Sequence, residues 1–374
     1  MRRALALGEL ALGGAYLSVW VATPWAARAR DALIEIAESL GLPSGPSQAL
    51  TVLGVAAAVG VPWWLATAPL DFFSEFVLPH RFGLSNQAGP GWLIDKLKAS
   101  LIGACLGGFS LAMLYLFLDG FPETWWLLAA GGYGTATVVL TALGPVLFIP
   151  LFFRMRPLGD KYADTAARLE RLAAAAGVRV QGVYSLDLSR RTKAANALLV
   201  GLGRTRKILV GDTLLESFEP DETETILAHE LGHHAHRDLP AGIVIQTLSM
   251  AVVFAASHLV LTRLAGSGHL MSLDDPAGIP ILALTLTAMG LAEAPVLNFY
   301  SRWREARADS YAVRLTGNGP AFARAMTRLG NQNLGEAMPP RWAVVLFGTH
   351  PPLQQRIERA FSLRRAPKGE TPGT

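Results

Sequence analysis

The chain has 374 residues, of which 51% are hydrophobic and only 17% are charged, and its mean hydropathy is +0.33. This composition excludes an ordinary soluble globular protein and indicates a chain embedded in a membrane. The net charge of +4 is attributed to basic loops beside anionic lipid, so membrane lipids are expected partners and nucleic acid is not.

Six apolar stretches are long enough to cross a bilayer as helices. They lie near residues 4–26, 48–70, 99–119, 124–154, 240–263 and 277–299. The first could instead be a signal peptide, because Arg2 and Arg3 precede it, but its length and Glu9 favour a retained helix. The predicted fold class is therefore mainly α: a polytopic membrane helical bundle of about six spans, with a small α/β module outside the membrane.

The fourth stretch is unusually long. As one helix, its roughly 31 residues at about 1.5 Å each would form a rod of about 46 Å, against a bilayer core of about 30 Å. We expect it to tilt, kink or project from the membrane. Gly144, Pro145 and Pro150 are the places where it can bend.

Positive charge in the loops predicts the orientation. Arg2 and Arg3, then Arg81 with Lys96 and Lys98, then the basic block 154–237 fall on alternate sides, and the intervening loops are poorer in Lys and Arg. By the positive-inside rule, the basic sides face the cytoplasm. We expect an integral, multi-pass protein of a bacterial cytoplasmic (inner) membrane, with both chain ends and the polar region 155–239 facing the cytoplasm.

The region between the fourth and fifth spans is the polar part. Residues 160–178 form an amphipathic pattern, and 180–188, 196–203 and 206–212 are strand-like, which predicts a small mixed α/β module. Further helices are expected at 301–314, 321–328 and 352–361. We expect four spans in 1–154, the polar α/β module in 155–239, two spans in 240–300, C-terminal helices in 301–361 and a disordered tail in 362–374.

The segment HELGHH at 229–234 has the spacing of a metal site. On a helix, His229 and His233 lie one turn apart on one face, so both imidazoles can reach one zinc ion while Glu230 lies over its open position. The acidic residues at 221–224 suit a helix N-terminus just upstream. The alternative is a solvated helix that happens to be rich in histidine.

An open zinc site needs a third protein ligand, and Glu305 in SRWREARADSYA is the best candidate. Asp309 follows by one helical turn, where it can accept a hydrogen bond from a ligand histidine. The alternative is a salt-bridged helix surface. The single cysteine, Cys105, excludes a disulfide and a thiolate zinc site.

Five segments in this order resemble the CAAX prenyl protease type 1 family of membrane-embedded zinc metallopeptidases. They are FFSEFVLPHRFGLSNQ (72–87), NALLVGLGRTRKILVGDTLL (196–215), HELGHH (229–234), NFYSRWREARAD (298–309) and THPPLQQRIERA (349–360). The family is known for seven spanning helices around a water-filled chamber with zinc at its cytoplasmic end. The resemblance implies that the bundle of this chain encloses a chamber, that 155–239 is a zincin-like α/β metalloprotease module in the cytoplasm, and that 301–361 forms C-terminal catalytic helices. This chain shows only six apolar stretches, and it carries Leu198 where an aromatic residue is common.

The resemblance also implies roles for residues that show little pattern of their own. Asn196, Ala197 and Leu198 would bind an extended substrate backbone beside the site. His350 would donate a hydrogen bond to the oxyanion of the transition state, and Arg356 would orient the site or the substrate. Apart from the resemblance, an Asn before a strand and a His before two prolines are ordinary loop residues.

The predicted function is that of a zinc-dependent endopeptidase acting on membrane-associated or prenylated-type peptides. One Zn²⁺ per chain, held by His229, His233 and Glu305, would lower the pKa of a water molecule, and Glu230 would take its proton. Substrates would be peptides or proteins, lipidated or not. Three alternatives stay open: an HtpX-type quality-control protease, an intramembrane site-2 type protease, and a non-catalytic lipid- or peptide-binding scaffold with a structural metal.

Overall fold

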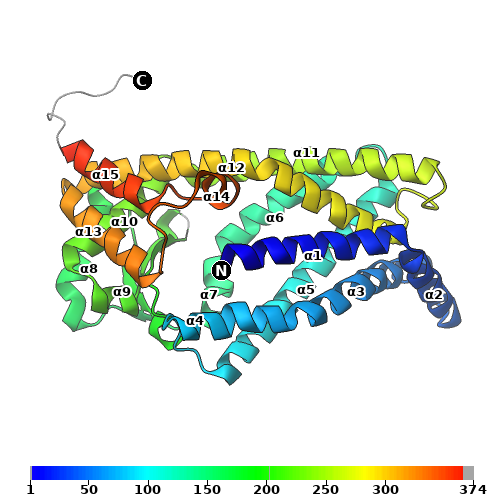
Figure 1. Ribbon diagram of the computed structural model, residues 1–374, viewed down its shortest axis with the longest axis horizontal. Helices are drawn as coiled ribbons and strands as arrows, with labels where there is room; N and C mark the ends of the chain where they lie inside the picture. Colours follow the sequence, from blue (N-terminus) through cyan, green and yellow to red (C-terminus); the bar gives the residue numbers. More distant parts are fainter. Residues whose placement is uncertain (1, 202, 365–374) are drawn as a thin grey trace, which may run out of the picture. The chain divides into compact units, whose positions relative to one another are not determined.

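The computed structural model describes residues 2–201 and 203–364, and its α-helices are labelled in Figure 1. The chain divides into two compact units. Unit 1 comprises Met1–Pro79, Gly89–Ala136 and Val244–Glu293, and unit 2 comprises His80–Ala88, Thr137–Ile243 and Ala294–Thr374.

Within the described residues, six helices are long and apolar enough to cross a membrane, which confirms the predicted number. They are Arg3–Ala22, Ser44–Arg81, Gly89–Gly120, Trp125–Leu147, Asp238–Gly266 and Pro276–Thr316. These segments contain α1 (Arg2–Ala22), α3 (Ser44–Asp71) with a π-helix (Phe72–Val77) and α4 (Leu78–Arg81), α5 (Gly89–Gly120), α6 (Trp125–Leu147), α11 (Asp238–Gly266) and α12 (Ile279–Thr316). Their interiors offer few polar side chains, so the backbone satisfies its own hydrogen bonds.

Two boundaries differ from the prediction. The first span ends at Ala22 and not at residue 26, because the chain turns at Pro24 into α2 (Trp25–Ser39), a helix that was not predicted. The second span continues past residue 70 to Arg81 through the π-helix. The fourth stretch, 124–154, is interrupted, which agrees with the expected bend near Pro145 and Pro150: α6 ends at Leu147 and a four-residue helix, α7 (Ile149–Phe152), follows.

Unit 1 has a hydrophobic core that includes Tyr115, Leu118, Trp125 and Leu261. A buried ion pair accompanies this core: Nη1 of Arg30 on α2 lies 2.6 Å from Oδ2 of Asp275, which precedes α12. The Asp275 carboxylate also accepts hydrogen bonds from the backbone N–H groups of Met271 and Ala277.

Unit 2 contains a four-stranded sheet in the order β1-β2-β4-β3. The strands are β1 (Met155–Pro157), β2 (Val183–Leu186), β3 (Ala197–Val200) and β4 (Lys207–Gly211). β2 and β4 run parallel, while β1 and β3 pair antiparallel with them, with Ala197 opposite Val210. The three predicted strands are confirmed, β1 was not predicted, and β3 forms one edge of the sheet.

The helices of unit 2 pack around this sheet. α8 (Ala163–Ala175), α10 (Pro220–Ala235) and α13 (Gly319–Gln332) lie side by side, as Figure 1 shows, and α9 (Asp212–Ser217) follows β4. They share a core with Leu169, Ile208, Leu227 and Leu231. The chain ends with α14 (Arg341–Phe347) and α15 (Leu353–Arg364).

Two predictions about the C-terminal region require correction. The span at 277–299 and the helix at 301–314 are one continuous helix, α12, because residues 296–301 contain no proline or glycine and the helix continues through Pro295. α15 extends to Arg364, so residues 362–364 of the expected disordered tail are helical. The rest of that tail, 365–374, lies outside the described residues.

Candidate metal centre

The helix α10 carries the HELGHH segment and is well defined at its start. Glu219 and Glu222 form a capping box: the side chain of each accepts a hydrogen bond from the backbone N–H of the other. Pro220 occupies the first helical position. Most of α10 is buried in the core of unit 2. The two histidines therefore project from a rigid element.

Gly232 brings a second helix against α10. A Cβ atom at Gly232 would lie 3.0 Å from Cα of Ala308 on α12, so only glycine permits the two backbones to approach this closely. Glu305 lies one turn before Ala308 on α12. The close approach thus places the carboxylate of Glu305 beside the histidines.

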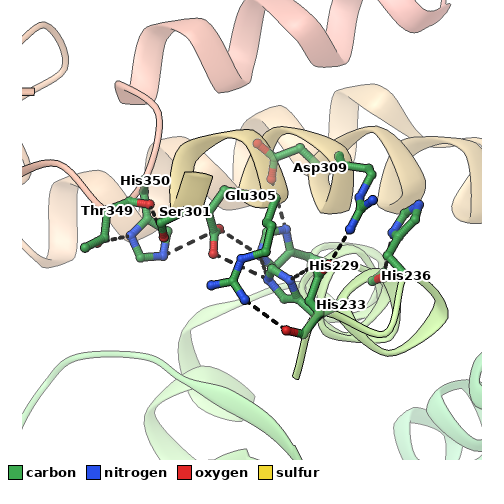
Figure 2. A network of polar contacts seen from close by, with 12 residues as sticks. His229, His233, His236, Ser301, Glu305, Asp309, Thr349 and His350 are labelled. Carbon is green, nitrogen blue, oxygen red and sulfur yellow. Dashed lines mark hydrogen bonds and ion pairs between the residues drawn. The ribbon is translucent and has the colours of Figure 1, made fainter. Parts of the chain in front are cut away.

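His229, His233 and Glu305 converge on one point, as Figure 2 shows. Nε2 of His229 lies 3.2 Å from Nε2 of His233 and 3.2 Å from Oε2 of Glu305. Nε2 of His233 lies 3.4 Å from Oε1 of Glu305. Ligands bound at about 2.0–2.1 Å around a tetrahedral zinc lie about 3.3 Å apart, so these separations and this N, N, O donor set fit a zinc ion.

Asp309 contacts Nδ1 of His229, and Arg356 in turn contacts Asp309. Nδ1 of His229 lies 2.9 Å from Oδ1 of Asp309, which is only 1% exposed, and Arg356 on α15 donates two hydrogen bonds to that carboxylate. Burial opposes the charged imidazolium, but hydrogen bonds to Asp309 and Glu305 outweigh this effect and raise the pKa of His229 to about 9. The Asp309 carboxylate beside Nδ1 favours a proton on that nitrogen, so Nε2 is the nitrogen that can bind a metal once the imidazolium has lost its other proton.

His233 has a comparable partner that the sequence analysis missed. Its Nδ1 lies 2.8 Å from Oδ2 of Asp238, a residue only 2% exposed, and Arg307 of α12 pairs with the other oxygen of that carboxylate. Burial acts to lower the pKa of His233, but the hydrogen bonds to Glu305 and Asp238 outweigh this effect, so the pKa is raised above its ordinary value. The nearest signal in the sequence was Asp238 itself, five residues after His233.

Glu230 lies between the two histidines and is partly buried. Burial raises the pKa of its carboxyl group, although the neighbouring His229 and His233 act in the opposite direction. A carboxylate with a raised pKa accepts a proton more readily than an exposed one.

His350 reaches the same cluster from the loop between α14 and α15. Its Nε2 lies 3.5 Å from Oε2 of Glu305, and its side chain is 58% exposed, so it faces both the cluster and solvent. Figure 2 shows His350 on the opposite side of Glu305 from the two histidines of α10. Nδ1 of His350 lies 2.9 Å from Oγ1 of Thr349.

Three side chains of α12 hold the segment that leads to His350. Asn298 donates to the carbonyl of Leu346 at 2.7 Å, and Ser301 donates to the carbonyl of Thr349 at 2.8 Å. Nη1 of Arg302 donates to the carbonyls of Val344 and Gly348, at 2.8 and 2.7 Å. Of these carbonyls, those of Val344 and Leu346 belong to the last turn of α14, and those of Gly348 and Thr349 follow that helix.

The three residues expected to bind substrate lie at the start of β3. Asn196 is exposed, and its carbonyl accepts from the backbone N–H of Gly211 at 2.8 Å; Ala197 is buried and Leu198 is partly buried. β3 contacts α10. Among the described residues, no hydrogen bond or ion pair links Asn196, Ala197 or Leu198 to the cluster of His229, His233 and Glu305.

Comparisons with known proteins agree with this geometry. Residues 160–363 match the family model of peptidase family M48, and residues 13–154 match that of the CAAX prenyl protease N-terminal region, described as five membrane helices. The chain is 27% identical over 327 residues to the uncharacterized metalloprotease YhfN of Bacillus subtilis, covering 86% of this chain and 76% of that protein. It is 27% identical over 334 residues to CAAX prenyl protease 1 of Saccharomyces cerevisiae, covering 83% and 71%.

The fold is also similar to a solved structure. The crystal structure of S. mikatae Ste24p superposes with a TM-score of 0.77 at 23% identity, covering 84% of this chain and 76% of that one. The M48 match spans the metal cluster and more than half of the chain, and the second match covers the N-terminal spans. The chain therefore belongs to peptidase family M48 and is a multi-pass membrane metallopeptidase of the CAAX prenyl protease family.

Proposed function

We propose that His229, His233 and Glu305 hold one catalytic zinc ion, and that Glu230 is the general base of peptide-bond hydrolysis. The observation that carries this proposal is the convergence of three donor atoms at separations of 3.2 to 3.4 Å. Three protein ligands leave a coordination position open, which is typical of catalytic zinc, whereas structural zinc usually has four. A scaffold with a structural metal is correspondingly disfavoured.

Zinc, when bound here, supplies a Lewis acid that polarises the scissile carbonyl and lowers the pKa of a water molecule. Glu230 takes the proton of the attacking water and delivers it to the leaving amine. The raised pKa of its carboxyl group suits this double role, because the group must both accept and release a proton near neutral pH.

His350 is proposed to stabilise the transition state. Its exposed imidazole lies beside Glu305, where its Nε2–H can donate to the oxyanion that develops on the substrate. Removing one such donor typically costs about 3 to 4 kcal/mol of transition-state stabilisation. His350 thus acts on the substrate and not as a fourth ligand.

The substrate is proposed to bind as an extended strand along the edge of β3. This strand pairs with β4 on one side only, and it contacts the helix that carries the histidines. An extended peptide can add to such an edge through main-chain hydrogen bonds, with Asn196, Ala197 and Leu198 as contact residues. Arg356 is engaged by Asp309, which supports a role in orienting the site and not in binding substrate.

We infer membrane-associated peptides, including lipidated ones, as the substrate class, because several similar proteins are CAAX prenyl proteases. A cytoplasmic active site in a bacterial inner membrane is proposed from the basic residues that flank alternate ends of the spans. Prenylated and unprenylated peptides of one sequence would measure what the lipid contributes to cleavage.

The test uses the full-length protein in detergent, with zinc content and peptide cleavage measured together. We expect the Glu230→Gln variant to keep its zinc and to lose cleavage, and a chelator to abolish the activity of the wild-type protein. Glu224→Gln, on the same helix but paired with Arg168, is the matched control and should remain active. Cleavage that persists in Glu230→Gln would overturn the assignment of the base.

A further inference from the structure

Each of the two histidines of the metal centre contacts a buried carboxylate, and each carboxylate contacts an arginine. For His229 these are Asp309 and Arg356. For His233 they are Asp238 and Arg307. We propose that Asp238 and Arg307 are positioning residues, which hold the ring of His233 in the orientation and tautomer that zinc requires. This inference rests on the proposed role of His233 as a ligand.

A sharp turn places Asp238 next to His233. α10 ends at Ala235, and Arg237 adopts a φ of 55°, in the left-handed region that residues other than glycine rarely occupy. Arg237 lies in the two-residue link between α10 and α11. As a result the first residue of α11, Asp238, returns its carboxylate to within 2.8 Å of His233 Nδ1.

Arg307 and Arg304 fix Asp238 from α12. Arg307 pairs with Oδ1 of Asp238, the oxygen that His233 does not use, and its guanidinium lies over the ring of Trp303 at 4.3 Å. Nη1 of Arg304 donates to the backbone carbonyl of Asp238 at 3.0 Å. Side chain and backbone of Asp238 are therefore both tied to the helix that supplies Glu305.

The chemistry of this contact concerns the metal site directly. A carboxylate facing Nδ1 requires Nδ1 to carry the proton, so the lone pair of Nε2 is directed at the point shared with His229 and Glu305. A carboxylate also makes the imidazole a stronger ligand. The alternative is that Asp238 and Arg307 only fasten α11 to α12; in that case the variants would change stability and leave zinc binding unchanged.

The Asp238→Asn variant separates these readings. The amide removes the negative charge, and its NH₂ group can face His233 or Arg307, so Nδ1 is no longer held as the only protonated nitrogen. We expect zinc affinity to fall by about 10- to 100-fold. Arg307→Lys keeps the positive charge but loses the planar fork, and a smaller loss is expected. Arg314→Lys, an exposed arginine on the same helix, is the matched control.

Zinc affinity is measured on full-length, folded protein by competition with a chromogenic chelator, and cobalt(II) is used in place of zinc to record the d–d absorption of the site. The inference predicts weaker binding and an altered cobalt spectrum in Asp238→Asn. Wild-type affinity and spectrum in that variant would overturn it. If Asp238→Asn does not fold, the same two measurements are made on Arg307→Lys, and wild-type affinity and spectrum in that variant would overturn the inference. Wild-type protein that binds no zinc would instead refute the proposed function, and this inference with it.

Discussion

Arg356 holds Asp309 through two parallel hydrogen bonds, from Nε to Oδ2 at 2.9 Å and from Nη2 to Oδ1 at 2.6 Å. The pair joins α15 to α12, and Asp309 in turn faces Nδ1 of His229. The last helix of the described chain is thus linked through Asp309 to His229, the first histidine of the candidate metal centre. A fork-shaped contact of this kind fixes the direction of the carboxylate as well as its charge.

Replacing Arg356 by Lys should weaken zinc binding by about 10- to 100-fold, because a single ammonium cannot make both hydrogen bonds. The measurement is zinc competition on purified protein. Arg341→Lys, an exposed change on α14, should bind zinc as the wild type does. Equal affinities in the two variants would mean that the fork does not orient Asp309.

Replacing His350 by Gln should lower kcat by roughly 10²- to 10³-fold while zinc content stays complete. The reason is that His350 lies 3.5 Å from Glu305 and is proposed to act on the oxyanion, so its effect falls on the transition state. Steady-state kinetics with a peptide substrate give kcat and KM separately. His269→Gln, in the loop before α12, is the control; loss of zinc from His350→Gln would indicate a ligand instead.

Replacing Arg302 by Met should lower kcat by loosening the end of α14, because the carbonyls of Val344 and Gly348 would lose the hydrogen bonds that Arg302 donates to them. The effect should act through His350. In a double-mutant cycle, Arg302→Met combined with His350→Gln should therefore cost no more than His350→Gln alone. Additive losses would show that Arg302 acts on something else. Arg314→Met on the same helix serves as the control.

Zinc uptake by the metal-free protein should release at least one proton at pH 7 to 8. Metal-free His229 has a pKa of about 9, so it is protonated there, and it must lose that proton to bind a metal. By the same linkage, this group stabilises the metal-free fold below about pH 6.5, and the contribution disappears as the pH rises through about 9. Calorimetry in buffers of different ionisation enthalpy counts the protons; no release would contradict the raised pKa.

Replacing Arg30 by Met should destabilise unit 1 by about 3 to 5 kcal/mol, because it leaves the buried Asp275 without its cation. Unfolding of the protein in detergent would measure this change. The exposed Arg28 on the same helix provides the comparison, and Arg28→Met should be near neutral. Similar stabilities of the two variants would show that the ion pair contributes little.

The amino-acid sequence alone determined the features that depend on local spacing. The apolar stretches predicted all six candidate spans, and the i, i+4 spacing of His229 and His233 predicted that they share one helical face. The one-turn spacing of Glu305 and Asp309 predicted a shared face in the same way. Such patterns are visible without the fold, because neighbours on a helix are also neighbours in the chain.

Only the tertiary structure decided what holds these elements together. Arg307 and Asp238 are 69 residues apart, and Arg30 and Asp275 are 245 residues apart, so no periodicity in the sequence links either pair. The sequence alone also gives no role to Gly232 within HELGHH, whereas in the fold this glycine lies against the backbone of Ala308. Long-range contacts of this kind depend on how whole helices pack, and a single sequence does not record which of many charged residues will meet.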